Sequence, residues 1–230
     1  MNPYFRTPPV VKNLLIVNCI IFLAMTLIPQ VETICYNYLS LIWDNGVPQY
    51  AAKYISFGDS VIRYFKNPHF HTYQFVTYMF LHGGFGHLFG NMFALWMFGR
   101  TLEYEIGSKR FLIYYMVCGI GAALIQVTLA TLLGEHMVLL GASGAVMGLL
   151  LAFGVMHPNN MVYVMPIPFP IKAKWFVIGY AVLEIALGSS NAVHFISDEG
   201  TGIAHFAHVG GMLWGLALLL WWKKRGKIYF

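Results

Sequence analysis

Six apolar segments dominate this sequence and leave few folds open to it. They lie at about residues 10–28, 84–102, 111–133, 142–156, 169–187 and 204–222. A membrane-spanning helix needs about 20 mostly apolar residues, and most of these segments approach that length. Only 10% of the residues are charged, whereas a soluble domain carries about 25%. The sequence therefore predicts an all-α polytopic membrane protein with six transmembrane helices, built as a single domain over residues 1–230.

The fourth segment is too short to cross a membrane alone. Ala142 to Met156 is 15 residues, which makes about 22 Å of helix, whereas the hydrocarbon core is about 30 Å thick. His157 and Pro158 then break the helix. Irregular backbone at membrane depth must be buried in protein or line a water-filled cavity. We therefore expect the fourth helix to begin within the membrane.

The basic residues indicate how the chain is oriented. Eleven of the 14 fall in connections on one side: Arg6, Lys12, Arg100, Lys109, Arg110, Lys172, Lys174, Lys223, Lys224, Arg225 and Lys227. The positive-inside rule then predicts that both termini are cytoplasmic. The long loop at about 29–72 holds the other three and faces outward, and we expect short helices in it that lie in the headgroup plane. Basic residues placed in this way favour a lipid bilayer as the partner and argue against nucleic acid.

Polar residues gather at the outward ends of the second, fourth and sixth segments. They are His82, His87, Asn91, Ser143, His205 and His208. Because these three segments begin on the same side, their polar groups can meet at one depth. Polar groups within a membrane are functional candidates by default.

Ser143 lies in the sequence Gly141-Ala142-Ser143-Gly144, at the first turn of the short helix. The unpaired N–H groups and the dipole of a helix N-terminus favour a developing oxyanion at this place. If the fourth and sixth helices pack closely, His208 can hydrogen-bond Ser143 and act as its general base. The alternatives are a helix-capping serine and a core histidine bonded to a backbone carbonyl.

Two pairs of glycines favour such packing. Gly144 and Gly148 lie four residues apart on the fourth segment, and Gly211 and Gly215 do so on the sixth. Faces of small residues with this spacing let membrane helices approach closely.

Other polar residues complete the predicted site. His87 and Asn91 share one helix face, and their N–H groups suit an oxyanion hole, whereas His82 is expected to make a structural interhelical hydrogen bond. No carboxylate has a clear claim to orient His208. Glu184, within the fifth segment, is interpreted as a packing or gate contact. We therefore favour a two-residue Ser–His arrangement over a triad.

A metal or haem site is the competing interpretation of the histidines. Its ligands would be His82, His87, His205 and His208. The sequence contains no H-E-x-x-H motif, and no carboxylate within the membrane has an evident pairing with these residues. We therefore predict that no metal and no other cofactor takes part.

Together the motifs resemble those of the rhomboid intramembrane serine proteases. The resemblance rests on His82-x4-His87-x3-Asn91, Gly141-x-Ser143-Gly144 and Ala207-His208-x-x-Gly211, in that order and on alternate segments. It implies that Ser143 is the nucleophile and His208 the base, and that His87, Asn91 and the backbone N–H of Ser143 bind the oxyanion. It also implies that Glu103 is a structural packing residue. The implied substrates are single-span transmembrane proteins, cut near the outer end of a helix that unwinds easily.

The sequence departs from the family pattern in two respects, at three positions. Tyr73 and Gln74 stand where many members carry a Trp-Arg pair, and Met147 stands where well-studied members have an aromatic ring on the base. A non-catalytic rhomboid-like protein that binds membrane clients is the alternative function, although such proteins usually lack the serine or the histidine. Because no organelle-targeting segment precedes the first apolar segment, the expected location is the cell (inner) membrane of a prokaryote.

Overall fold

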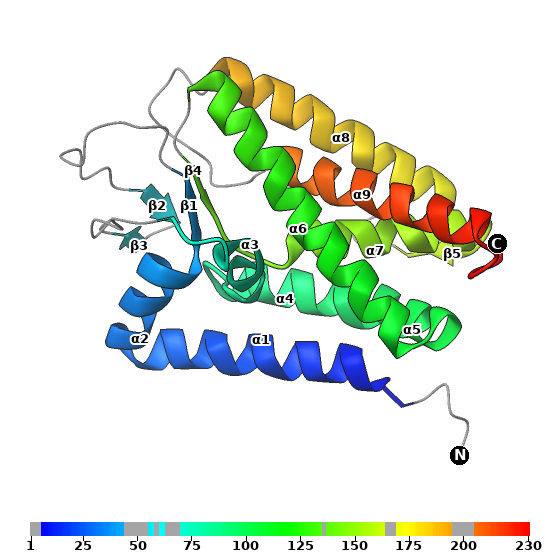
Figure 1. Ribbon diagram of the computed structural model, residues 1–230, viewed down its shortest axis with the longest axis horizontal. Coiled ribbons are helices and arrows are strands. Elements are labelled where there is room, and N and C mark those ends of the chain that lie inside the picture. Colours follow the sequence, from blue (N-terminus) through cyan, green and yellow to red (C-terminus); the bar gives the residue numbers. More distant parts are fainter. Residues whose placement is uncertain are drawn as a thin grey trace.

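A computed structural model describes residues 6–43, 55–57, 60–62, 70–134, 137–163, 169–194 and 205–230. For 55–57, 60–62 and 189–194 the description covers the backbone alone. Figure 1 shows long helices running alongside one another, with short strands near both ends.

Helices make up most of the described chain. The long ones are α1 (Pro9–Leu27), α6 (Ser108–Leu133), α8 (Ala173–His194) and α9 (His205–Lys224). Another helix is continuous from Phe85 to Ile106 and consists of α4 (Phe85–Ala94), a π-helical turn (Leu95–Gly99) and α5 (Arg100–Ile106). Each predicted apolar segment is helical over most of its described length. The largest difference is at α8, which continues to His194 rather than ending at residue 187.

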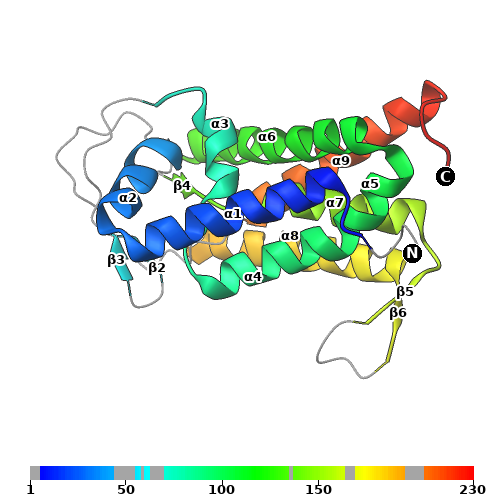
Figure 2. The same cartoon turned by 90° about the horizontal axis from the view of Figure 1, so that it is seen from below.

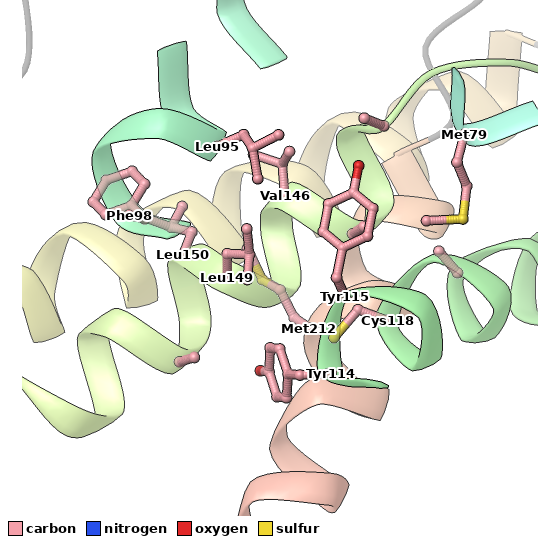
Figure 3. Close-up of a cluster of buried hydrophobic side chains, with 14 of the residues drawn as sticks. Met79, Leu95, Phe98, Tyr114, Tyr115, Cys118, Val146, Leu149, Leu150 and Met212 are labelled. Atoms are coloured by element: carbon pink, nitrogen blue, oxygen red, sulfur yellow. The ribbon is translucent and has the colours of Figure 1, made fainter. Parts of the chain in front are cut away.

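The short fourth helix is α7, Ser143–Met156, with 14 residues. It ends directly before His157 and Pro158, as the breaker predicts. α7 lies inside the bundle against α6 and α9 (Figure 1). Figure 3 shows Val146, Leu149 and Leu150 of α7 in a buried apolar cluster with Tyr114 of α6 and Met212 of α9.

In its described part, the segment 29–72 contains short helices, as the sequence predicts, and also short strands, which we do not expect from the sequence. α2 (Pro29–Ile34) and a π-helical turn (Cys35–Leu39) are helical. However, β1 (Leu41–Trp43) pairs antiparallel with β4 (Met137–Leu139), and β2 (Ile55–Phe57) pairs with β3 (Ser60–Ile62). Isoleucine, valine and aromatic residues recur in these four strands and favour extended backbone. Lys53, Arg63 and Lys66 lie outside the described residues.

Three shorter elements complete the fold. α3 (Gln74–Thr77) continues into a 3₁₀ turn (Tyr78–Phe80) that leads to α4. β5 (Met161–Val162) and β6 (Ile171–Lys172) pair between α7 and α8.

The basic helix ends meet at one end of the bundle. The start of α1, the junction of α5 with α6, the start of α8 and the end of α9 lie together there, as both views show (Figures 1 and 2). α2, β1 and β4 lie toward the opposite end (Figure 1). The sequence predicts this grouping of the basic segments on one side.

Glu103 ties the start of α1 to α5 and α6. This buried carboxylate accepts hydrogen bonds from the backbone N–H groups of Val10 at 3.0 Å and Val11 at 2.8 Å. The Ser108 hydroxyl donates to it at 2.6 Å. A carboxylate at a helix N-terminus pairs orphan N–H groups and suits the helix dipole. Glu103 is thus a structural residue, as the family resemblance implies.

Large apolar side chains are exposed on the outer helix faces. On α4, Phe85, Phe89 and Phe93 are 72%, 60% and 48% exposed. On α8, Ile178 and Val182 are likewise exposed. Among the described residues, α1 and α6 are each long and apolar enough to cross a membrane.

Candidate active site

A glycine turn delivers Ser143 to the start of α7. Gly141 has φ +117°, a conformation that L side chains rarely adopt, and a Cβ there would lie 2.7 Å from the His87 ring. The Gly141 N–H donates to the Tyr78 carbonyl at 2.9 Å, which fixes the turn against the 3₁₀ segment. Ser143 is then the first residue of α7 and is half-buried.

Ser143 and His208 are in direct contact. Their Oγ and Nε2 atoms are 2.8 Å apart, which is hydrogen-bonding distance. No side chain caps the α7 N-terminus, so the helix-capping interpretation of Ser143 is wrong. His208, on the first turn of α9, is only 9% exposed. An imidazole placed in this way can accept the serine proton and so activate Oγ as a nucleophile.

Glycines bring the two helices close enough for that contact. A Cβ built on Gly211 of α9 would lie 1.9 Å from the Gly144 carbonyl oxygen of α7. The predicted close packing of α7 on α9 is therefore confirmed at these two residues.

The second glycine of each pair also faces α6. Gly148 borders both α9 and Cys118, and Gly215 packs on the Tyr114 hydroxyl and Cys118 rather than on α7. The Tyr114 hydroxyl fills this space and donates to the Gly148 carbonyl at 2.9 Å. Side chains of α6 therefore fill the space beside Gly148 and Gly215, where the sequence predicts that the two glycines are in direct contact.

His87 lies beside the serine turn, and Asn91 is buried one helical turn further along α4. The His87 ring packs on Gly141. The Asn91 Nδ2 donates one hydrogen bond to the His87 carbonyl at 2.9 Å, so its second N–H remains as a donor. Their assignment to an oxyanion hole stays a prediction.

His82 is buried next to His87, with ring centroids 5.0 Å apart. Its ring nitrogens are buried without a hydrogen-bond partner among the described side chains and backbone. The structural interhelical hydrogen bond expected of His82 is therefore not formed within that part of the chain.

Glu184 of α8 is the residue whose position differs most from expectation. Its Oε2 is 2.7 Å from His205 Nδ1, in hydrogen-bond geometry, and 3.0 Å from His208 Nδ1. The carboxyl group thus reaches the ring of the predicted base, on the nitrogen that does not face Ser143. The predicted segment bounds could have indicated this proximity. Glu184 lies three residues from the outer end of 169–187 and His208 lies four residues from the outer end of 204–222, so both are expected at a similar depth.

The histidines of the metal alternative do not converge on one point. Within the described ranges, the group of potential ligands that comes together is Glu184, His205 and His208, with ligand atoms within 4.8 Å of one another. His82 and His87 form a separate pair. The four-histidine site is therefore not formed as the sequence alternative supposed.

Comparisons with known proteins agree with the motifs. The family model of the rhomboid domain matches residues 69–225. Rhomboid-like protein 11, chloroplastic, from Arabidopsis thaliana is 30% identical over 161 residues, which cover 64% of this chain and 51% of that protein. Rhomboid protein 1, mitochondrial, from Saccharomyces cerevisiae is 32% identical over 139 residues, which cover 60% and 38%. The matches span about half or less of these relatives. Because the domain match covers most of the described helices, from α3 to α9, this chain belongs to the rhomboid family of membrane proteins.

Proposed function

We propose that this protein is an intramembrane serine endopeptidase that hydrolyses peptide bonds of transmembrane proteins through a Ser143–His208 dyad. The observation that carries the proposal is the 2.8 Å contact between Ser143 Oγ and His208 Nε2. A serine at a helix N-terminus, bonded to a mostly buried imidazole, has the arrangement of an activated nucleophile. Membership of the rhomboid family supports the same activity.

The reaction would proceed by acyl transfer. His208 accepts the Ser143 proton while Oγ attacks the scissile carbonyl, and it then donates that proton to the leaving amine. The oxyanion is stabilised by the Ser143 backbone N–H, His87 and Asn91, with the α7 dipole favouring the negative charge. Water then hydrolyses the acyl-enzyme. The scheme uses no metal and no other cofactor.

The membrane setting is part of the proposal. The continuous helix from Phe85 to Ile106 has 22 residues, α8 has 22 and α9 has 20. At 1.5 Å per residue each is about 30 Å long or more. With α1 and α6 they give five spanning helices around the shorter α7, which is the sixth helix of the membrane domain but does not cross the membrane alone. Exposed apolar faces on α4 and α8 suit contact with lipid.

The basic end of the bundle would face the cytoplasm, together with both termini. Ser143 then opens toward the outer side, below the surface, because α7 is too short to reach both faces. The location would be a cell (inner) membrane, with the chain inserted as a multi-pass protein. Single-span transmembrane proteins are the proposed substrates, because the nucleophile lies where a membrane helix would have to unwind to be cut.

The test compares wild-type protein with Ser143→Ala on a transmembrane reporter substrate in liposomes, with and without a chelator. We expect cleavage that withstands the chelator and falls by at least about 10⁴-fold in Ser143→Ala. A fluorophosphonate probe should label wild-type protein and not the variant. Folded wild-type protein that neither cleaves the reporter nor reacts with the probe would refute the proposal and favour a client-binding role.

A further inference from the structure

Glu184 brings a carboxylate to the side of the His208 ring that faces away from Ser143. Its Oε2 is 3.0 Å from His208 Nδ1, while Nε2 of the same ring is 2.8 Å from Ser143 Oγ. The Glu184 side chain is buried between α8 and α9, at 4% exposure. We propose that Glu184 is a positioning residue for His208 and that His205 holds the Glu184 carboxylate in place. This inference rests on the proposed function.

A neutral imidazole carries one proton, and its position decides whether His208 can act as a base. Nε2 must be unprotonated to accept the proton of Ser143, so the ring proton must sit on Nδ1. An ionised carboxylate beside Nδ1 favours that tautomer. When His208 takes the second proton and becomes imidazolium, the same carboxylate stabilises the new charge.

His205 explains why the carboxylate stays at this place. Its Nδ1 is 2.7 Å from Glu184 Oε2 in hydrogen-bond geometry, whereas the 3.0 Å approach to His208 Nδ1 is not aligned as a hydrogen bond. Catalytic hydrogen bonds are often poorly aligned before substrate binds. A small rotation of the His208 ring or the carboxylate would align the second bond without breaking the first.

The Tyr180 side chain, one turn earlier on α8, interacts with the same carboxylate. The groups that face Glu184 are therefore Tyr180 on its own helix and the two histidines of α9. Together they hold the carboxylate next to the His208 ring, which is what a positioning residue requires.

A metal held by Glu184, His205 and His208 is the competing explanation. Ligand atoms around a tetrahedral zinc ion, each about 2.0–2.1 Å from the metal, are separated by about 3.3 Å. The His205–Glu184 distance of 2.7 Å is shorter than that and matches a charge-assisted hydrogen bond. The observed distances therefore favour hydrogen bonding.

The experiment uses full-length protein in liposomes and two variants of the carboxylate. Glu184→Gln keeps the shape and removes the charge, and Glu184→Asp keeps the charge on a shorter side chain. Glu103→Gln is the matched control. Glu103 is also a buried carboxylate, but it accepts hydrogen bonds from the N-terminus of α1 and not from the histidines of the dyad site. The measurements are kcat and KM on the reporter, the pH dependence of kcat and the rate of fluorophosphonate labelling of Ser143.

We expect Glu184→Gln to lower kcat and the labelling rate by about 10²- to 10³-fold, with KM within threefold of wild type. The acidic limb of its pH–rate profile should move to lower pH, because the imidazolium loses a neighbouring negative charge. Glu184→Asp should recover at least tenfold of the loss. Folded Glu103→Gln should be labelled at the wild-type rate.

Three results would overturn the inference. The first is labelling of Glu184→Gln within threefold of wild type. The second is equal loss in both Glu184 variants with a lowered unfolding temperature, which indicates a purely structural role. The third is stoichiometric zinc that disappears in Glu184→Gln. A wild-type protein without labelling or cleavage would instead refute the proposed function, and the inference with it. That case is distinct because the wild-type protein itself is then inactive, whereas the three results above are obtained with an active wild type.

Discussion

Adding one methyl group to Gly211 should separate His208 from Ser143. The Cβ of Gly211→Ala would lie 1.9 Å from the Gly144 carbonyl oxygen, whereas ordinary contacts begin at 3.4 Å. That oxygen belongs to helix backbone and cannot rotate away, so α9 must move from α7 by about 1.5 Å. A shift of this size along the line between the two side chains would lengthen the 2.8 Å Ser143–His208 contact to about 4 Å. A displacement of about 1 Å can lower a rate by about 10²-fold.

The assay is the rate of fluorophosphonate labelling of Ser143, together with reporter cleavage, at a temperature where the variant remains folded. We expect both rates to fall by at least about 10²-fold. Overpacking should also lower the free energy of unfolding by about 1–3 kcal/mol. Gly179→Ala is the control, because a Cβ at Gly179 meets nothing within 4 Å. A folded Gly211→Ala protein that keeps more than a third of the wild-type labelling rate would refute the reasoning.

Two further substitutions test the scaffold around the dyad. Gly141→Ala combines a strained φ of +117° with a Cβ that would lie 2.7 Å from the His87 ring. We therefore expect the free energy of unfolding to fall by about 1–3 kcal/mol and reporter cleavage to become slower. Cleavage at the wild-type rate would contradict this. Glu103→Gln weakens the bonds to the α1 N-terminus and should lower the free energy of unfolding by about 1–2 kcal/mol, while kcat of the folded protein stays unchanged. A lowered kcat without a change in stability would place Glu103 in the reaction instead.

The positions of the helices and of the dyad could be predicted from the sequence because each depends on a local signal. Apolar runs, the His157-Pro158 break and the small residues at Gly144 and Gly211 all act within one helix or at one close contact. These signals placed α7 and the Ser143–His208 contact correctly. They also placed the basic segments together at one end of the bundle.

What could not be predicted depends on partners that are distant in the sequence. The pairing of β1 with β4 places Leu41 opposite Leu139. The local sequence of either strand does not indicate which other strand it pairs with. The role of Glu184 depends on His205 and His208, which follow it by 21 and 24 residues in the sequence and belong to a different helix. A lone carboxylate in an apolar segment indicates that a partner exists, but does not say which of nine histidines it is.

The Glu103 cap has a consequence for the order in which the chain is assembled during synthesis. α1 leaves the ribosome before the residue that completes its first turn, because Glu103 follows Val10 by 93 positions. Until the helix that ends at Ile106 has been made, the N–H groups of Val10 and Val11 lack their carboxylate partner. A nascent chain that stops short of Glu103 therefore lacks the carboxylate that pairs these N–H groups, and this contact of α1 forms only after the helix that follows it in the sequence has been made.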